Sequence, residues 1–296
     1  MMKKTLVIGA SGSFGKELIK FYNPKKIICT YYKNPINKGI KFNAISDKIE
    51  NIINKFDGIS EGILLFAEKN PNTCFQNKKY SNKLNVLAIK KIIKVFKKFN
   101  IKPIFLSTDL VFSGKKGNYS EKSNPNPKTL YGKQKYSVEK IITKNFKNYL
   151  IFRLSKTYCF KDKKDSFLNW VNFLENNEEI LCAKDQIYNP IYLKDAAKVV
   201  YNISKKKSNG VFNVAGPKSY SRYEIFKKLN KEYFQFQKRK VNLIICKFND
   251  LNKNYEKWPL NTSMNMTKLN KALNINYMSL NKALNHTVKI YFKTKV

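Results

Sequence analysis

The chain has 296 residues, 43% of them hydrophobic and 14% aromatic, which is enough to bury the core of one domain or of one domain with a smaller lobe. The formal net charge is +38, and 58 − 3 = 55 of the basic residues are lysines spread along the chain. Surfaces that bind nucleic acid favour arginine for its bidentate hydrogen bonds, so we predict no nucleic-acid partner. No apolar run reaches eighteen residues, so we expect no membrane span, and the apolar stretch at the N-terminus is too short for a signal peptide.

The first predicted element is an apolar strand over residues 4–9 that leads directly into a glycine-rich turn and a helix. Glycines with the spacing Gly-x-x-Gly-x-x-Gly let the backbone approach a pyrophosphate, and the flanking strand and helix are the context that this pattern requires. We therefore predict a dinucleotide site of the Rossmann type. Its residues are Gly9, Ser11, Gly12, Ser13, Phe14 and Gly15.

The second predicted strand, residues 26–31, ends where a carboxylate would bind the adenosine ribose of NAD. No carboxylate is present there, and Lys33 follows instead. A lysine at this position can pair with a 2′-phosphate, so we predict NADPH as the cofactor, with NADH as the alternative.

The next predicted elements alternate between strands and helices. A third strand is expected over residues 39–42, a helix over 46–56 with Ser46 as its cap, and a fourth strand over 62–66. Pro71 opens a helical region that runs through Phe99 with a lysine-rich outer face.

The central stretch presents the candidate chemistry. A short buried strand over residues 104–106 ends in the polar run Ser107, Thr108 and Asp109, and a long loop rich in Gly, Ser, Asn and Pro follows. A helix then begins near Thr129 and places Tyr131 and Lys135 four residues apart on one face. A neighbouring ammonium favours phenolate, so we expect a lowered tyrosine pKa and a usable proton donor.

The Tyr-x-x-x-Lys spacing alone is weak evidence, because it occurs five more times in the chain. Context selects Tyr131, since it follows a strand ending in Ser-Thr-Asp in a chain that begins with a dinucleotide pattern. The other matches start at Tyr22, Tyr136, Tyr201, Tyr223 and Tyr291.

The remaining elements complete an α/β pattern. We predict strands over residues 149–154 and 210–216, a helix over 162–178, a helix capped at Ser221 and a last helix over 279–291. Strands that alternate with helices imply a Rossmann-type, doubly wound parallel sheet, with ligands in a crevice at its carboxyl edge.

The same pattern predicts a larger domain and a smaller lobe. Residues 1–155 should form the dinucleotide-binding domain, to which residues 190–216 return. Residues 156–189 and 217–296 should form a smaller C-terminal substrate-binding lobe.

The central stretch also resembles a known family, the extended short-chain dehydrogenase/reductases, and within it the dTDP-4-dehydrorhamnose reductase branch. Later segments match as well, so the resemblance covers nearly the whole chain. The motifs that carry it are Ser107-Thr-Asp-Leu-Val-Phe-Ser-Gly114, Tyr119-Ser-Glu and Pro127-x-x-x-Tyr131-Gly-x-x-Lys135-x-x-x-Glu139.

The resemblance implies a cytoplasmic, NADPH-dependent reductase of a nucleotide-linked 4-keto-6-deoxysugar, with a homodimer as the assembly to consider. Tyr131 would be the general acid, Lys135 would hold the nicotinamide ribose and Thr108 would hydrogen-bond the carbonyl oxygen. Further cofactor contacts would come from Asn43, Phe66, Ala67 and Asn85. The substrate would be bound by Thr108, Asp109, Lys156 and Asn189.

Several residues depart from the family pattern and leave alternatives open. Leu110 stands where related dehydratases have a glutamate base, which argues against dehydration. Lys156, Cys159 and Trp258 replace a usual tryptophan, glycine and arginine, and these changes leave the sugar undetermined. A sugar-nucleotide epimerase, or a non-catalytic subunit resembling the regulatory subunit of methionine adenosyltransferase, therefore remains an alternative.

The cysteines and the histidine restrict the chemistry further. The five cysteines are widely separated and contain no Cys-x-x-Cys pair, so we interpret them as reduced thiols of a cytoplasmic protein. His286 is the single histidine, which argues against a histidine-based zinc site and a Ser-His-Asp hydrolase. We predict no metal site.

Overall fold

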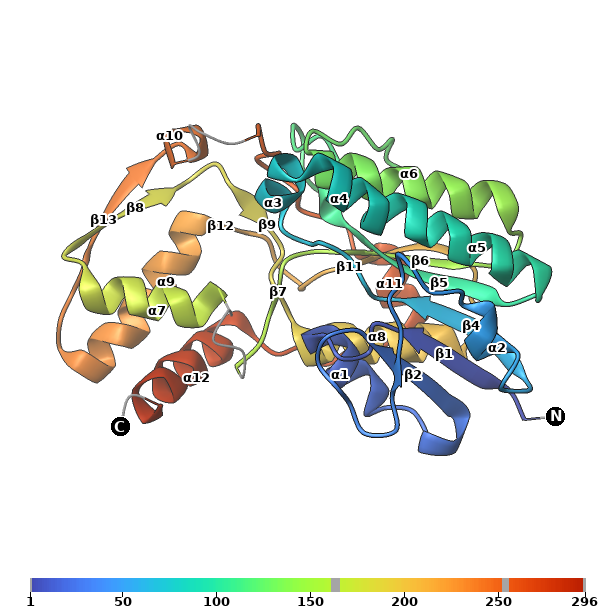
Figure 1. Cartoon of the computed structure of the whole chain (residues 1–296). Coiled ribbons are helices and arrows are strands. Elements are labelled where there is room, and N and C mark those ends of the chain that lie inside the picture. The colour runs from blue at the N-terminus through green and yellow to red at the C-terminus, as the bar shows by residue number, and fades with distance from the viewer. Residues whose placement is uncertain (1, 161–165, 252–255, 295–296) are drawn as a thin grey trace.

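The computed structural model describes residues 2–160, 166–251 and 256–294, which form a larger body around a central sheet and a smaller lobe beside it (Figure 1). The N-terminal strand lies in the larger body, and the last helix, α12, lies in the lobe. Within those described ranges, no helix combines the length and the apolar character that crossing a membrane requires.

The central sheet has seven strands, and every pair in it is parallel, which confirms the predicted fold class. The order reverses direction between β1 and β4, which is where ligands bind in sheets of this type. Across the sheet the strands are β11 (Gly210–Val214), β6 (Leu150–Leu154), β5 (Lys102–Thr108), β4 (Ile59–Leu64), β1 (Lys4–Ile8), β2 (Ile27–Tyr31) and β3 (Ile40–Lys41).

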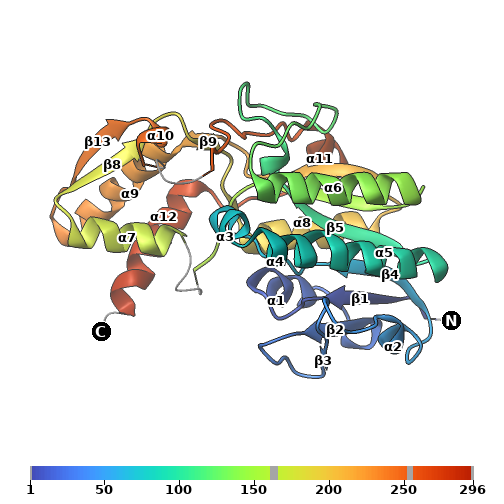
Figure 2. The same cartoon turned by 45° about the horizontal axis from the view of Figure 1, so that its top comes forward.

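Helices cover both faces of this sheet (Figure 2). One face carries α1 (Ser13–Ile19), α8 (Leu193–Lys205) and α11 (Thr267–Ala272). The other carries α2 (Glu50–Ile53), α5 (Ile89–Lys98) and α6 (Leu130–Asn145).

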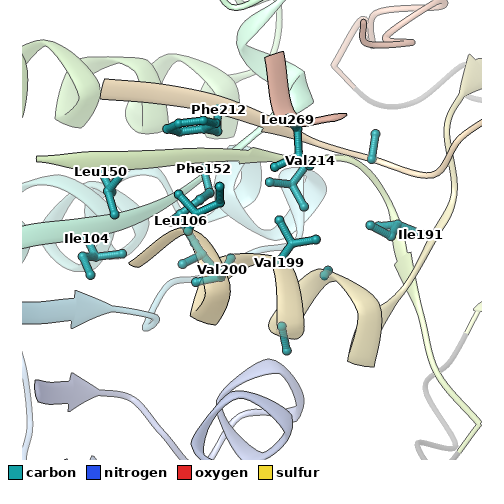
Figure 3. Close-up of a cluster of buried hydrophobic side chains, with 14 of the residues drawn as sticks. Ile104, Leu106, Leu150, Phe152, Ile191, Val199, Val200, Phe212, Val214 and Leu269 are labelled. Atoms are coloured by element: carbon teal, nitrogen blue, oxygen red, sulfur yellow. The ribbon is translucent and has the colours of Figure 1, made fainter. Parts of the chain in front are cut away.

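The strands are apolar on both sides because both faces are covered. In β5, Ile104 and Leu106 point into the core on the α8 side, where Figure 3 shows them with Val199 and Val200, while Phe105 packs on the opposite face. Successive side chains of a strand point to opposite faces, so an uninterrupted apolar run is what a buried parallel strand requires.

The helical region predicted from Pro71 is confirmed as four consecutive segments. Its start is capped by Asn70, whose side chain accepts hydrogen bonds from the amides of Asn72 and Thr73. The segments are α3 (Pro71–Gln76), α4 (Lys78–Asn82), a π-helical turn over Lys83–Ala88, and α5.

The helix predicted over residues 46–56 is wrong in extent, because only α2 forms there, and Ser46 is not its cap. The Asp47 carboxylate accepts the amide of Asn43 and the hydroxyl of Ser46 instead. These local side-chain bonds give the backbone an alternative to the helix, so residues 43–47 form turns.

The lobe is built around packed aromatic side chains. It contains α7 (Ser166–Asn176), α9 (Arg222–Gln237) and α12 (Leu280–Lys293), and the rings of Trp170 and Phe226 stack 4.4 Å apart between α7 and α9. The predicted cap of α9 is confirmed, since Ser221 and Glu224 form a capping box. The first residues of the helix predicted over 162–178 lie outside the described part of the chain.

Short strand pairs complete the lobe and its junction with the sheet. β8 (Glu179–Ala183) pairs with β13 (Asn242–Cys246) in the lobe, a parallel pairing that sequence reasoning missed. At the junction β7 (Thr157–Tyr158) pairs with β10 (Ile191–Tyr192), and β9 (Ile187–Tyr188) pairs with β12 (Tyr220–Ser221). The one-turn helix α10 (Phe248–Leu251) follows β13.

A buried ion pair fastens α6 to the sheet. The Arg153 Nη2 atom on β6 lies 2.7 Å from the Glu139 Oε2 atom on α6, and these side chains are 5% and 3% exposed. The Ser107 hydroxyl at the end of β5 donates to the same carboxylate. The pair therefore fixes α6 relative to the two strands that end beside it.

Removing one partner of this pair should leave a buried charge unpaired. We expect Glu139→Gln to lower the free energy of unfolding by about 3–5 kcal/mol in urea titrations. The matched control is Glu17→Gln, which removes the carboxylate of the exposed Glu17–Lys20 pair and should change stability by no more than about 0.5 kcal/mol. Equal losses from the two variants would contradict a structural role for the buried pair.

Candidate active site

Tyr131 and Lys135 lie in the first turns of α6 on the side that faces the sheet. Thr129 caps the helix by accepting a hydrogen bond from the Gly132 amide, which places Tyr131 just inside the helix start. The Lys135 Nζ atom donates to the carbonyl of Leu106 at 2.8 Å, and it lies 5.7 Å from the centre of the Tyr131 ring. The ammonium is therefore held between β5 and the phenol.

Burial dominates the electrostatics of this pair. Tyr131 is 8% exposed and Lys135 4% exposed. Burial raises the pKa of Tyr131, with smaller contributions from Cys74, Asp109 and Glu68 in the same direction. Burial also lowers the pKa of Lys135 to about 8. The lowered tyrosine pKa that we predicted from the four-residue spacing is therefore wrong, because spacing does not reveal desolvation.

Burial of the lysine distinguishes this pair from other Tyr-x-x-x-Lys matches. Lys135 is buried, whereas the lysines of four other matches are exposed. These four are Lys26, Lys140, Lys205 and Lys227. The fifth match ends at residue 295, outside the described part of the chain. The context argument that favoured Tyr131 therefore agrees with the difference in burial.

Thr108 and Asp109 lie at the carboxyl end of β5, beside the start of α6. Thr108 Oγ1 accepts the Leu110 amide at 3.2 Å and donates to Asp109 Oδ1 at 3.1 Å. The other Asp109 oxygen accepts a 2.7 Å hydrogen bond from the hydroxyl of Thr262. Burial raises the pKa of Asp109 to about 6, against the lowering effect of these hydrogen bonds.

The segment around Thr262 packs against the loop that follows β5. Gly114 and Gly117 have φ angles of 73° and 72°, and a Cβ atom on either would overlap Pro259 or Asn261. In the sequence, residues 258–263 are distinguished only by their resemblance to the family, from which Trp258 departs. Their contact with Asp109, across 153 positions, had no sequence signal.

The glycine turn between β1 and α1 has the shape that a dinucleotide needs. Gly9 has φ 87° and packs against Phe66, and Gly15 approaches the Ala10 backbone so closely that a Cβ atom would lie 2.5 Å from its carbonyl oxygen. A Cβ atom on Gly12 would meet only the Gly9 carbonyl, at 3.8 Å, so the backbone is accessible there. The residues present therefore fit a bound pyrophosphate.

The predicted adenosine contacts lie beyond β2 and β3. Lys33 is exposed, and no described carboxylate lies within 4 Å of its ammonium. The Asn43 side chain accepts the Ile45 amide at 3.0 Å, which fixes it in a turn. The structure therefore leaves Lys33 accessible to an anion. The side-chain oxygen of Asn43 already accepts a hydrogen bond from the backbone.

Asn85 lies in the π-helical turn and is fully buried, so it is not an ordinary surface group. Its amide group binds the backbone N–H and carbonyl of Glu68, at 2.8 and 2.9 Å, and donates to the Gln134 side chain at 2.8 Å. Gln134 in turn donates to Ser81 at 2.9 Å. Asn85 thereby holds the segment after Phe66 and Ala67 against α6, and sequence reasoning missed Gln134 and Ser81.

Polar atoms without partners in the described structure lie at the junction between the sheet and the lobe. Ser155 follows β6, Tyr188 lies on β9, and the hydroxyl groups of both are buried without a hydrogen bond. The cations of Lys156 and Arg222 lie 6.0 and 5.4 Å from the centre of the Trp170 ring. From the sequence we predict Lys156 as a substrate contact but name neither Ser155 nor Arg222 as one.

The backbone holds Asn189 through hydrogen bonds, and Trp258 lies beside another aromatic ring. The Asn189 side chain donates to the Gly216 carbonyl at 3.2 Å and accepts the Met264 amide at 2.9 Å, so the backbone uses both ends of its amide. The Trp258 ring lies 6.0 Å from that of Phe248. All five cysteines are free thiols, and the described residues contain no cluster of three or more potential metal ligands.

Comparisons with known proteins show the family to which the chain belongs. Residues 2–292 match the family described as RmlD substrate binding domain. The chain is 24% identical over 242 residues to methionine adenosyltransferase 2 subunit beta of Xenopus tropicalis, covering 75% of this chain and 70% of the relative.

Solved structures with the same fold include two reductases. A hypothetical dTDP-4-dehydrorhamnose reductase from Sulfolobus tokodaii is 25% identical with a TM-score of 0.80, covering 94% of this chain and 98% of that chain. A dTDP-4-dehydrorhamnose reductase from Bacillus anthracis, in complex with NADP, is 21% identical with a TM-score of 0.79, covering 99% and 100%.

The raised pKa of Asp109 predicts a pH-dependent stability. Its folded-state pKa of about 6 lies above the ordinary value of 3.8. Above pH 6 the carboxylate is ionised in the folded and the unfolded protein, and its burial lowers the free energy of unfolding. That cost disappears at a pH low enough to protonate the group in both the folded and the unfolded protein. We expect Asp109→Asn to raise the free energy of unfolding at pH 7 by about 1–3 kcal/mol and to leave it unchanged near pH 3.

Urea unfolding at the two pH values measures both effects. Asp47→Asn is the control, because hydrogen bonds to Asn43 and Ser46 lower the pKa of that exposed carboxylate, and its removal should not stabilise the protein at pH 7. An Asp109→Asn variant that is less stable than its parent at pH 7 would show that the carboxylate is not penalised by burial.

Proposed function

Since this chain belongs to the RmlD substrate binding domain family, we propose that it is an NADPH-dependent reductase of a nucleotide-linked 4-keto-6-deoxysugar. The observation that carries the proposal is the buried Lys135 ammonium, held beside the Tyr131 ring by the carbonyl of Leu106 on β5, the strand that ends at Thr108. The solved reductase bound to NADP, which has the same fold, supports the choice of cofactor class.

In this mechanism the chain supplies a proton and orients the carbonyl. NADPH, when bound, supplies the hydride that adds to the carbonyl carbon. The Tyr131 hydroxyl donates its proton to the oxygen, which becomes the alcohol, and Thr108 hydrogen-bonds the same oxygen. The raised pKa keeps Tyr131 protonated at neutral pH, and the Lys135 ammonium stabilises the phenolate that remains after the transfer.

The cofactor would lie along the edge of the sheet from β2 to β5. The turn from Gly9 to Gly15 would hold the pyrophosphate, and Lys33 would pair with the 2′-phosphate that distinguishes NADPH from NADH. Phe66 and Ala67 would line the dinucleotide, and Asn85 would keep that segment in place through Glu68.

The substrate would lie between this edge and the lobe. The buried hydroxyls of Ser155 and Tyr188 have no partner in the described structure, and sugar hydroxyl groups would satisfy them. Arg222 and Lys156 would attract the negative charge of the nucleotide part, and Asp109 would accept a hydrogen bond from the sugar.

A second function is favoured by one specific observation. The relatives from Xenopus, rat and mouse are each named as a subunit of methionine adenosyltransferase. A non-catalytic, dinucleotide-binding subunit would keep the glycine turn and would not require Tyr131. A sugar-nucleotide epimerase is the third candidate, because the same Tyr–Lys pair serves reversible oxidation.

Replacement of Tyr131 separates these functions. We expect Tyr131→Phe to lower kcat for NADPH oxidation with nucleotide-4-ketosugars by at least about 100-fold, because the proton donor is lost, while NADPH binding stays within about threefold. Turnover is followed by NADPH absorbance and binding by calorimetry. The assay first screens the parent protein against several nucleotide-4-ketosugars.

The matched control is Tyr136→Phe on the same helix, since Tyr136 has the same spacing to Lys140 but lies outside the site, and its kcat should be unchanged. An unchanged kcat in Tyr131→Phe would remove this residue from the mechanism. A parent protein that binds NADPH but turns over no ketosugar would favour the subunit, and C4-epimerised product without net NADPH consumption would favour the epimerase.

A further inference from the structure

A groove of about 700 Å³ lies between α5 and α6 on the face that these helices turn away from the sheet. The two helices run side by side there in both views (Figures 1 and 2). Neither Tyr131 nor Lys135 lines the groove, so it is separate from the candidate active site. Its lining residues are Lys90, Ile93, Lys94, Lys97, Ser137, Lys140, Ile141, Lys144 and Asn145.

Lysines form the walls of this groove, which we call the α5–α6 groove. Five of its nine lining residues are lysines, against 55 lysines in 296 residues for the chain, so the groove is enriched even in this lysine-rich protein. The five are exposed. Ile93 is 2% exposed and Ile141 is half-buried, so the floor is apolar.

The positive charge of the groove is not compensated locally. The sequence of α5 contains no acidic residue, and the one acidic residue of α6, Glu139, is buried and paired with Arg153. In the described part of the chain, none of the five ammonium groups has a carboxylate within 4 Å. Like charges four residues apart, as in Lys90–Lys94 and Lys140–Lys144, destabilise a helix.

We propose that the α5–α6 groove binds an acidic, amphipathic helix of a partner protein. From Lys90 to Lys97 the groove extends about 10 Å along α5, which is the length of two helical turns. Carboxylates on the flanks of such a helix would pair with the lysines, and apolar side chains between them would contact Ile93 and Ile141.

Other occupants fit the groove less well. A second copy of this chain, docked through the same surface, would bring five lysines against five and would be repelled. Single-stranded nucleic acid is usually held by arginines and by aromatic rings on which bases stack, and the groove has neither. An acidic helix uses both the charged walls and the apolar floor.

The test uses a fluorescein-labelled helical peptide of about 20 residues with glutamates and leucines on one face, and the same peptide with glutamines in place of the glutamates. Binding to the full chain is measured by fluorescence anisotropy at low and physiological salt. We expect the glutamate peptide to bind, the glutamine peptide to bind at least tenfold more weakly, and acetylation of the groove lysines to be suppressed in the complex.

Two triple variants localise the binding. Lys94→Gln/Lys140→Gln/Lys144→Gln should weaken the glutamate peptide about tenfold or more. The control with the same change in charge, Lys25→Gln/Lys48→Gln/Lys55→Gln, alters exposed lysines elsewhere and should weaken it less than about threefold. Circular dichroism melting should show both variants folded, because the substituted side chains are exposed.

Three results would overturn the proposal. Equal weakening by the two triple variants would show diffuse attraction rather than a site. Equal binding of the glutamate and glutamine peptides would remove the role of charge. A mixed-sequence DNA strand that binds more tightly than the glutamate peptide, and loses affinity only in the groove variant, would assign the groove to nucleic acid.

Discussion

The candidate site depends on one buried cation, the ammonium of Lys135. Taking a lysine ammonium out of water is costly, and this one is compensated by the Leu106 carbonyl and by the faces of the Phe105 and Tyr131 rings. The compensation is partial, because burial lowers the pKa of Lys135 to about 8. The position of the cation therefore requires α6 to be held rigidly against β5.

Two polar networks on either side of Lys135 provide that rigidity. The Glu139–Arg153 ion pair joins α6 to β6 and to Ser107 at the end of β5. Asn85 and Gln134 join α6 to the π-helical turn and to the segment after β4. Both networks are buried, so their hydrogen bonds are costly to break, and they fix the carboxyl edges of three neighbouring strands around the site.

Much of this arrangement could be predicted from the sequence because its signals are local. The glycine turn at Gly9, the polar end of β5 at Thr108 and the helix start at Tyr131 are each contained within a few residues, and the alternation of strands with helices implies the sheet that brings them together. The cap at Ser221 is local in the same sense.

The missing parts of the prediction depend on distant contacts or on burial. The Thr262–Asp109 hydrogen bond and the β8–β13 pairing join residues far apart in the chain. The tyrosine pKa was predicted in the wrong direction because the Tyr131–Lys135 spacing shows a neighbouring charge but not the desolvation that outweighs it. A crystal structure of the protein with NADP⁺ is the most direct test of the site. It should show the nicotinamide ring facing the Tyr131 hydroxyl, with Lys135 Nζ about 3 Å from a ribose hydroxyl. A dinucleotide bound away from the Gly9 turn, or a nicotinamide turned away from Tyr131, would contradict the proposed reductase.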